Sequence, residues 1–292
     1  MTIRQLRPGD EAALEAFLAG RAESSMFLRA NLRAAGLVDG GGPAQGTYLA
    51  DFAGTAITGV IAHYGYGNVL IQAPHDAAAL AHAYAAAAKR AVQGLLGPLD
   101  QVTAIRAILA PAGWRVSKDS AETLFVLDLA DLVMPALLQR PGVAARQAVD
   151  ADRELLAGWW HDYEVELLGE TPGPALLAKA RADFQRRGAA TGGPWLLFDG
   201  GQPVATQSFN AALPDIVQVG GVWTPPALRG RGYARAVVAA ALHAQHARGV
   251  RRAVLFTGFD NAPAQRAYRA LGFTPVGEYA LVLFRPPVPA AP

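Results

Sequence analysis

The sequence contains no cysteine. This absence excludes disulfide bonds, thiolate zinc sites, cysteine-held iron–sulfur clusters and a cysteine nucleophile. Charged residues are also scarce, at 17% of the chain against 52% hydrophobic residues, so the composition favours a packed core over disorder. The net charge is only +2, and basic residues occur singly or in pairs. The composition therefore gives no reason to expect a nucleic-acid partner.

Two kinds of long apolar segment are missing as well. The N-terminal residues MTIRQLRPGDEAALEAF contain acidic side chains where a signal peptide would need an apolar core. The most apolar long stretch, residues 76–96, is mostly alanine and contains Asp, His, Lys and Arg, so it predicts a soluble helix and not a membrane span. We therefore expect a cytoplasmic protein with no membrane partner.

The two halves of the chain have the same outline. Each opens with a short strand and an amphipathic helix, and in each an Asp precedes the apolar period at a position that predicts an N-cap. A hairpin, a further strand and an alanine-rich helix follow in both halves. We predict a tandem α+β repeat of two domains, residues 1–137 and 138–292, with a seam near Pro135 and Pro141.

The most specific stretch is ALRGRGYARAV, residues 227–237, which lies between a predicted strand and a predicted helix. Glycine at a helix start leaves the free backbone N–H groups open to an anion, and the helix dipole and the arginines favour phosphate. A simple turn with solvated arginines is the alternative. The corresponding stretch of the first half, APHDAAALAHA, has neither the glycines nor the arginines.

The flanking segments support a binding role for this loop. Gly220 and Gly221 lie inside a predicted strand, where paired glycines predict a bulge or the close approach of another backbone. Residues 253–273 predict a strand, a turn and a helix that begins at Asn261 or Ala262 and stops at Gly272. Residues 276–284 predict a closing strand.

Two of these motifs, in this order, resemble those of the GNAT acetyltransferases. The loop matches the family's acetyl-CoA pattern at Arg229, Gly232 and Ala234, and DNAPAQRAYRALGF matches its later Asn-to-Tyr helix motif. The resemblance covers about residues 140–292, and the first half resembles a degenerate copy by element order alone. It implies two GNAT-like domains in tandem, each a mixed, mostly antiparallel twisted sheet flanked by helices.

The resemblance also implies acetyl-CoA as co-substrate, with no metal, bound by the second domain. Backbone groups of Val222 and Thr224 would pair with the pantetheine arm, and the amides from Arg229 to Ala234 would hold the pyrophosphate. The cofactor-binding residues that it implies are Val222, Trp223, Thr224, Arg229, Gly230, Arg231, Gly232, Tyr233, Ala234 and Asn261.

Acetyl transfer to an amine needs a proton acceptor and a proton donor, because an amine of pKa about 10.4 is mostly protonated at neutral pH. Tyr268, which the family motif places near the thioester sulfur, is the predicted donor to the departing thiolate. Residues 159–172 concentrate His161, Asp162, Glu164, Glu166 and Glu170. We name Glu166 as the candidate base, and a solvated acidic face is the alternative. The acidic cluster suggests a cationic amine acceptor.

The function that follows is direct transfer of an acetyl group, in a ternary complex, to an amine of a small molecule or peptide. Two alternatives stay open, namely a tandem acyltransferase with a larger acyl donor and a non-catalytic acyl-CoA-binding sensor or scaffold protein. His243 and His246 share a helix face, and we interpret them as surface residues and not as metal ligands. The sequence leaves a homodimer open.

Overall fold

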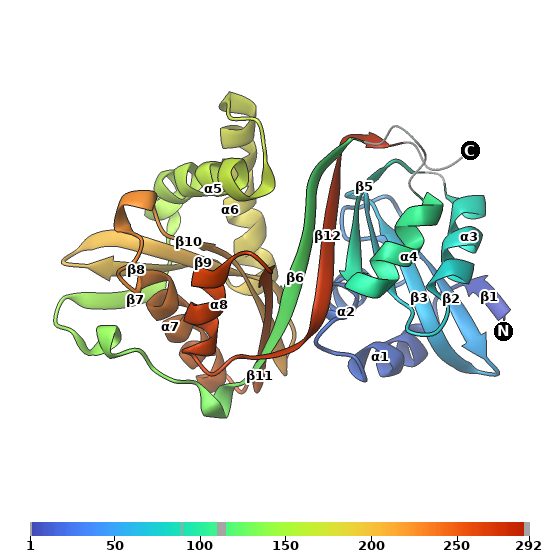
Figure 1. The fold of residues 1–292 in the computed structure, drawn as a ribbon, viewed down its shortest axis with the longest axis horizontal. Helices are drawn as coiled ribbons and strands as arrows, with labels where there is room; N and C mark the ends of the chain where they lie inside the picture. The colour runs from blue at the N-terminus through green and yellow to red at the C-terminus, as the bar shows by residue number, and fades with distance from the viewer. Residues whose placement is uncertain (1, 89, 110–114, 289–292) are drawn as a thin grey trace. The chain divides into compact units, whose positions relative to one another are not determined.

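The computed structural model describes residues 2–88, 90–109 and 115–288, in which the chain forms two compact units (Figure 1). The first unit comprises Met1–Leu124 and Gly277–Pro292, and the second comprises Phe125–Val276. The sequence suggested a single division between residues 137 and 138. The structure instead divides the chain within a strand, at residue 124, and returns the C-terminal segment to the first unit. None of the helices in these ranges is long and apolar enough to cross a bilayer.

The first unit is a sheet with helices. Its elements, in chain order, are β1 (Thr2–Gln5), α1 (Glu11–Ala19), α2 (Met26–Ala35), β2 (Gly46–Ala53), β3 (Ala56–Tyr64), β4 (Asn68–Gln72), α3 (Ala77–Ala87), β5 (Val92–Pro98) and α4 (Leu99–Leu109). The strands β1 to β4 are successively antiparallel, whereas β4 and β5 are parallel.

The second unit repeats this order of elements. They are β7 (Val143–Gln147), α5 (Arg153–Leu168), α6 (Pro174–Thr191), β8 (Trp195–Asp199), β9 (Gln202–Ala212), β10 (Ile216–Trp223), α7 (Tyr233–Ala247), β11 (Arg252–Gly258) and α8 (Ala262–Arg269). β10 and β11 form the parallel pair in the same place as β4 and β5. The predicted tandem α+β repeat is therefore confirmed.

The two halves also repeat an ion pair that the sequence pattern did not reveal. Arg4 donates to both carboxylate oxygens of Asp10 at 2.7 and 2.8 Å, and Arg146 binds Asp152 in the same way at 2.7 and 3.0 Å. Asp10 and Asp152 lie at the predicted N-cap positions of α1 and α5, but neither side chain caps its helix. Their carboxylates accept from arginine instead. The hydrogen bond from Arg4 lowers the pKa of Asp10 to about 2.

The C-terminal strand of the chain returns to the first unit, and the last strand of the first half runs from the first unit into the second. β12 (Thr274–Val288), which contains the predicted closing strand, pairs antiparallel with β5 of the first unit, where Ala280 lies opposite Gly97. β6 (Val116–Asp128) is the neighbour of β11 in the sheet and extends into the second unit from Phe125. The pattern of a single strand predicts its conformation but not the edge to which it pairs. For this reason the sequence did not predict the exchange.

The predicted long helix over residues 76–96 is wrong in its second part. The helix α3 stops at Ala87, and residues 92–98 form β5. Val92, Leu95 and Leu96 are buried, and β5 pairs with β4 on one side and β12 on the other. Pairing on both edges overrides the helical propensity that the preceding alanines suggested.

The core of the second unit lies between the sheet and α7. Apolar side chains of this helix, among them Val237, Val238 and Leu242, are fully buried against strand residues such as Phe209 and Val219. This packing fixes the start of α7 relative to the ends of β10 and β11, where the predicted site lies.

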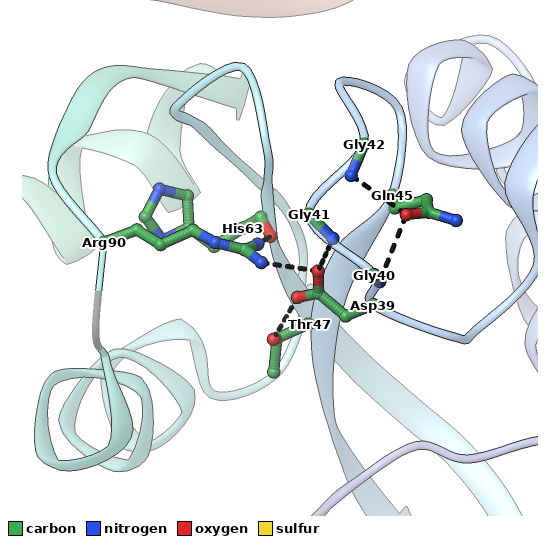
Figure 2. Close-up of polar contacts among 8 residues, drawn as sticks. All are labelled: Asp39, Gly40, Gly41, Gly42, Gln45, Thr47, His63 and Arg90. Atoms are coloured by element: carbon green, nitrogen blue, oxygen red, sulfur yellow. Dashed lines mark hydrogen bonds and ion pairs between the residues drawn. The ribbon is translucent and has the colours of Figure 1, made fainter.

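A polar cluster in the first unit attaches the loop of residues 39–45 to strand β2 and to Arg90 (Figure 2). The Asp39 carboxylate accepts from Arg90 at 2.5 Å, from the Thr47 hydroxyl at 2.7 Å and from the Gly41 N–H at 3.2 Å. The Gln45 side chain accepts from the N–H groups of two further loop glycines. The cluster supplies partners for the backbone of a glycine-rich loop that has few apolar contacts.

His63 lies beside this cluster and is buried. Its Nδ1 is 2.8 Å from the Tyr84 hydroxyl, and its carbonyl accepts from Arg90 at 3.4 Å. Burial lowers the pKa of His63, and the nearby Arg90 charge adds to the effect. The folded protein therefore holds this imidazole neutral.

This environment predicts a pH-dependent loss of stability. Because the pKa of His63 is lowered on folding, the unfolded chain takes up a proton first as the pH falls below about 6.5. Stability is complete above that pH and is lost as the pH falls from there through the folded-state pKa. Thermal unfolding between pH 7.5 and 5.0 should show this loss for the wild type and a smaller loss for His63→Asn. The exposed control His75→Asn should behave like the wild type. An unchanged pH slope in His63→Asn would contradict this interpretation.

Candidate active site

The glycine–arginine loop lies where strand β10 gives way to helix α7. Gly230 and Gly232 have left-handed backbone angles, with φ of 79° and 82°, and Gly232 is the N-cap of α7. The N–H of Ala236 makes the first bond along the helix, to Gly232 O at 3.0 Å. The N–H groups of Tyr233, Ala234 and Arg235 precede that bond and have no carbonyl four residues earlier in the helix. We interpret these N–H groups as a candidate site for an anion such as phosphate.

A buried side chain anchors this helix start. The Tyr233 hydroxyl donates to Asp199 Oδ2 at 2.5 Å, and Asp199 also forms an ion pair with Arg140. These donors lower the pKa of Asp199, with the Tyr233 hydrogen bond as the largest cause. The sequence analysis predicted that Tyr233 binds the cofactor through its backbone. Its side chain is buried within the second unit and holds the helix start in place through Asp199.

The strand that leads into the loop separates from its parallel neighbour. In the described part of the chain, β10 pairs with β11 only from Ile216 to Gln218. Beyond that point β10 has an irregular register with β9, and Gly221 adopts a φ of 57°. A Cβ on Gly220 would lie 2.1 Å from Asn210 Nδ2. The predicted bulge is confirmed, and beyond Gln218 the described residues show no pairing of β10 with β11.

Two polar side chains at the end of β10 are buried without hydrogen-bond partners among the described residues. They are the indole N–H of Trp223 and the hydroxyl of Thr224. A buried polar group without a partner is costly, so a bound molecule is a reasonable partner for each. Together with the glycine loop and the part of β10 that does not pair with β11, these groups are candidate contacts for the thioester arm and phosphates of acetyl-CoA.

Arg229 turns away from the helix start. Its Nε donates to Thr224 O at 3.0 Å, its guanidinium lies 4.8 Å from the centre of the Trp223 ring, and its two terminal nitrogens bind Glu166 at 2.8 and 2.9 Å. Arg229 therefore makes its contacts away from the helix start, although it lies in the same loop as Gly232. The predicted phosphate ligand is held by a carboxylate of α5.

Arg235 belongs to the loop motif, but the sequence analysis did not predict it as a site residue. Its Nη2 lies 3.9 Å from the position that a Cβ would take on Gly232, so its guanidinium is beside the helix start. Its Nε is buried and has no hydrogen-bond partner among the described residues. The sequence feature that could have indicated this position is that Arg235 lies in the first turn of the helix, three residues after the second glycine. The side chain of Arg231 is exposed.

The later motif lies at the same edge of the sheet, because the parallel strands β10 and β11 end there. Helix α8 begins at Ala262, as predicted, and Asn261 Oδ1 caps it by accepting from the Ala264 N–H at 3.3 Å. Gln265 donates to the carbonyls of Gly258 and Phe259 at 3.1 and 3.2 Å and so ties the helix to the end of β11. Helix capping alone accounts for an asparagine at position 261. The contact of Asn261 with the cofactor stays a prediction.

Tyr268 lies in α8 and is partly buried. Its ring packs edge-on against Phe273, with centroids 5.9 Å apart, at the margin of the core. The Tyr268 ring therefore contributes to packing, whether or not its hydroxyl takes part in catalysis as predicted.

The acidic residues of α5 have basic partners within the chain. Glu164 is buried and binds Lys179 at 2.7 Å, Asp162 lies 3.1 Å from His161 Nδ1, and Glu166 binds Arg229. This pairing reduces the negative field that the sequence suggested for a cationic acceptor. Glu166 is close to the loop, as the candidate base should be, but it is engaged there. His243 and His246 of α7 are exposed.

The first unit has contacts of its own at the corresponding place. After β4, the N–H of Ala73 donates to Gln101 Oε1 at 2.6 Å, and Gln101 is buried. A Cβ on Gly97 would lie 2.7 Å from Ile71 O, so the two parallel strands approach closely there. In this unit a side chain of the chain itself is the partner of the backbone N–H that follows the strand.

Comparison with known proteins agrees with this division. Residues 154–273 match the model of the acetyltransferase (GNAT) family. A stretch of 78 residues is 36% identical to a mycothiol acetyltransferase of Corynebacterium glutamicum (strain R), and it covers 27% of this chain and 27% of that relative. The matched stretch is thus about a quarter of either protein.

Two solved structures share the fold over almost the whole chain. A tandem GNAT protein from the clavulanic acid biosynthesis pathway superposes with a TM-score of 0.57 at 17% identity, over 100% of this chain and 99% of that one. A GCN5-related N-acetyltransferase from Kribbella flavida gives a TM-score of 0.56 at 21% identity, over 92% of this chain and 96% of that one. At these identities the likeness concerns the fold alone. The predicted fold of two GNAT-like units in tandem is confirmed.

The loop geometry makes a prediction for Gly232→Val. A β-branched residue disfavours the φ of 82° at this position, although the surrounding space is open, because the nearest side-chain atom lies 3.8 Å from the position that a Cβ would take. The loop N–H groups should move, and CoA affinity measured by calorimetry should fall tenfold or more, or ~1.4 kcal/mol.

Gly249→Val is the matched control. Gly249 also has a left-handed φ, of 94°, and open space around it, but it follows the other end of α7. This variant should keep CoA affinity. Equal losses in both variants would show that backbone strain acts through global stability and not through the loop.

Proposed function

We propose, from the match of residues 154–273 to the acetyltransferase (GNAT) family, that this chain transfers an acetyl group from acetyl-CoA to an amine of a small molecule or peptide. The single observation that carries the proposal is the start of α7, where two left-handed glycines open three free N–H groups beside the separated strands β10 and β11. A candidate anion site beside a stretch of β10 that does not pair with β11 suits a long molecule with a pyrophosphate at one end.

The residues divide the binding of this donor substrate between them. The loop amides from Arg229 to Ala234 would hold the pyrophosphate, with Arg231 and Arg235 supplying positive charge and Arg229 joining them. Backbone groups of Val222 and Thr224 would pair with the amide-bearing arm along the open edge of β10, beside the Trp223 indole and Asn261. The bound donor supplies an activated acetyl thioester.

The proton transfers fall to two side chains. Glu166 would accept the proton of the acceptor ammonium, so that the neutral nitrogen can attack the acetyl carbon. As the carbon–sulfur bond breaks, the Tyr268 phenol would give its proton to the departing thiolate. The attacking nitrogen would lose its second proton to solvent, which also returns a proton to the phenolate, and the products are a neutral amide and free CoA thiol. From the mycothiol acetyltransferase we extend only acetyl transfer to this chain. Of the acceptor we propose only that it carries an amine.

Release of free CoA thiol in the presence of a panel of amines tests the proposal. We expect thiol release that depends on one class of amine and on acetyl-CoA. Tight CoA binding without turnover for any amine would contradict the enzymatic role. It would favour an acyl-CoA-binding sensor, which the engagement of Glu166 by Arg229 in this structure makes the relevant second candidate.

The proton-donor role predicts the behaviour of Tyr268→Phe. This change removes one hydroxyl and keeps the ring that packs against Phe273. Turnover should fall by roughly 10²–10⁴, the usual contribution of a general acid. The dissociation constant of acetyl-CoA should hardly change, because the contact strengthens only as charge develops on sulfur.

Tyr66→Phe in the first unit makes the same chemical change outside the proposed site and should keep full turnover. Near-normal turnover in Tyr268→Phe would show that water protonates the thiolate unaided. Parallel losses of binding and thermal stability in that variant would show that the hydroxyl has a structural role.

A further inference from the structure

The bidentate ion pair between Glu166 and Arg229 joins the acceptor side of the site to the cofactor loop. Glu166 belongs to α5, and Arg229 immediately precedes the first loop glycine. Their side chains meet at 2.8 and 2.9 Å, and about two-fifths of each is exposed, 42% for Glu166 and 44% for Arg229. The proposed base and the proposed phosphate ligand are therefore paired with each other in this structure.

The guanidinium of Arg229 is held by two kinds of contact. Its Nε donates to Thr224 O at 3.0 Å, and its plane lies over the Trp223 ring at 4.8 Å, so the near end of the group is fixed beside the loop. The far end, with both terminal nitrogens, is directed at the Glu166 carboxylate. Only the second contact involves a partner that carries charge and can be replaced by another anion.

We propose that the pyrophosphate of acetyl-CoA replaces Glu166 on Arg229, so that cofactor binding releases the Glu166 carboxylate to act as the base for the acceptor amine. This exchange rests on the proposed function. It gives the site an order of events, in which the acceptor meets a free base only after the donor is bound. Before that, the base and the phosphate ligand neutralise each other.

The charges make the exchange favourable. A half-exposed ion pair contributes little to stability, because water screens it and two long side chains must be held in place. A pyrophosphate at the start of α7 has more negative charge than one carboxylate and also meets the free N–H groups of the helix. Arg229 can keep its contacts with Thr224 and Trp223 while its terminal nitrogens change partner.

Competition of this kind predicts that loss of the Glu166 charge strengthens CoA binding. Glu166→Gln keeps the shape of the side chain and removes the competing anion, so calorimetry should give about two- to fivefold tighter CoA binding than in the wild type. The gain should disappear when Glu166→Gln is combined with Arg229→Gln, because the released arginine is then absent.

Glu154→Gln is the matched control on the same helix. Glu154 also forms a bidentate pair, with Arg181 at 2.7–3.1 Å, but has no contact with the loop among the hydrogen bonds of the described chain. This variant should leave CoA affinity unchanged. Thermal unfolding of each variant, recorded in parallel, separates an effect on binding from an effect on folding.

The outcomes distinguish the two proposals. A folded wild type that does not bind CoA would overturn the proposed function itself. Normal CoA binding by the wild type, with equal or weaker binding by Glu166→Gln, would overturn the exchange and leave acetyl transfer in place. A gain that persists in the double variant would also overturn it, because the effect would then not pass through Arg229.

Discussion

The start of helix α7 is the constraint on which the rest of the site depends. Its free N–H groups bind an anion only if the backbone before them turns sharply and carries no side chain in the way, and the left-handed Gly230 and Gly232 meet both conditions. The Tyr233–Asp199 hydrogen bond and the apolar face of α7 then hold that helix start against the sheet. Packing in the core thus fixes the position of a polar site at the surface.

The same end of the sheet brings the other groups together. Because β10 and β11 are parallel, the loop before α7 and the loop before α8 both lie at their carboxyl ends. The irregular register of β10 with β9 and the left-handed Gly221 lie on the strand that leads into the first of these loops. Glu166 reaches this edge from α5 through its contact with Arg229. A candidate anion site, the end of β10 and a carboxylate therefore meet in the second unit.

The local features of this site could be predicted from the sequence, because each depends on a few neighbouring residues. The glycine pair predicted the bulge, the Asn-Ala-Pro run predicted the start of α8, and the element order predicted the tandem fold. Features that depend on distant residues could not be predicted in this way. Examples are the exchange of β6 and β12 between the units, the pairing of Glu166 with Arg229, and the strand formed by residues 92–98.

The contrast between the two units leads to our central claim, that the repeat keeps one cofactor site. In the first unit, the buried Gln101 side chain binds the Ala73 N–H that follows β4, and the first half lacks the glycines and arginines of the second unit's loop. Calorimetric titration of the full chain with CoA tests this claim most directly. We expect about one CoA bound per chain, and two sites of similar affinity would contradict the claim.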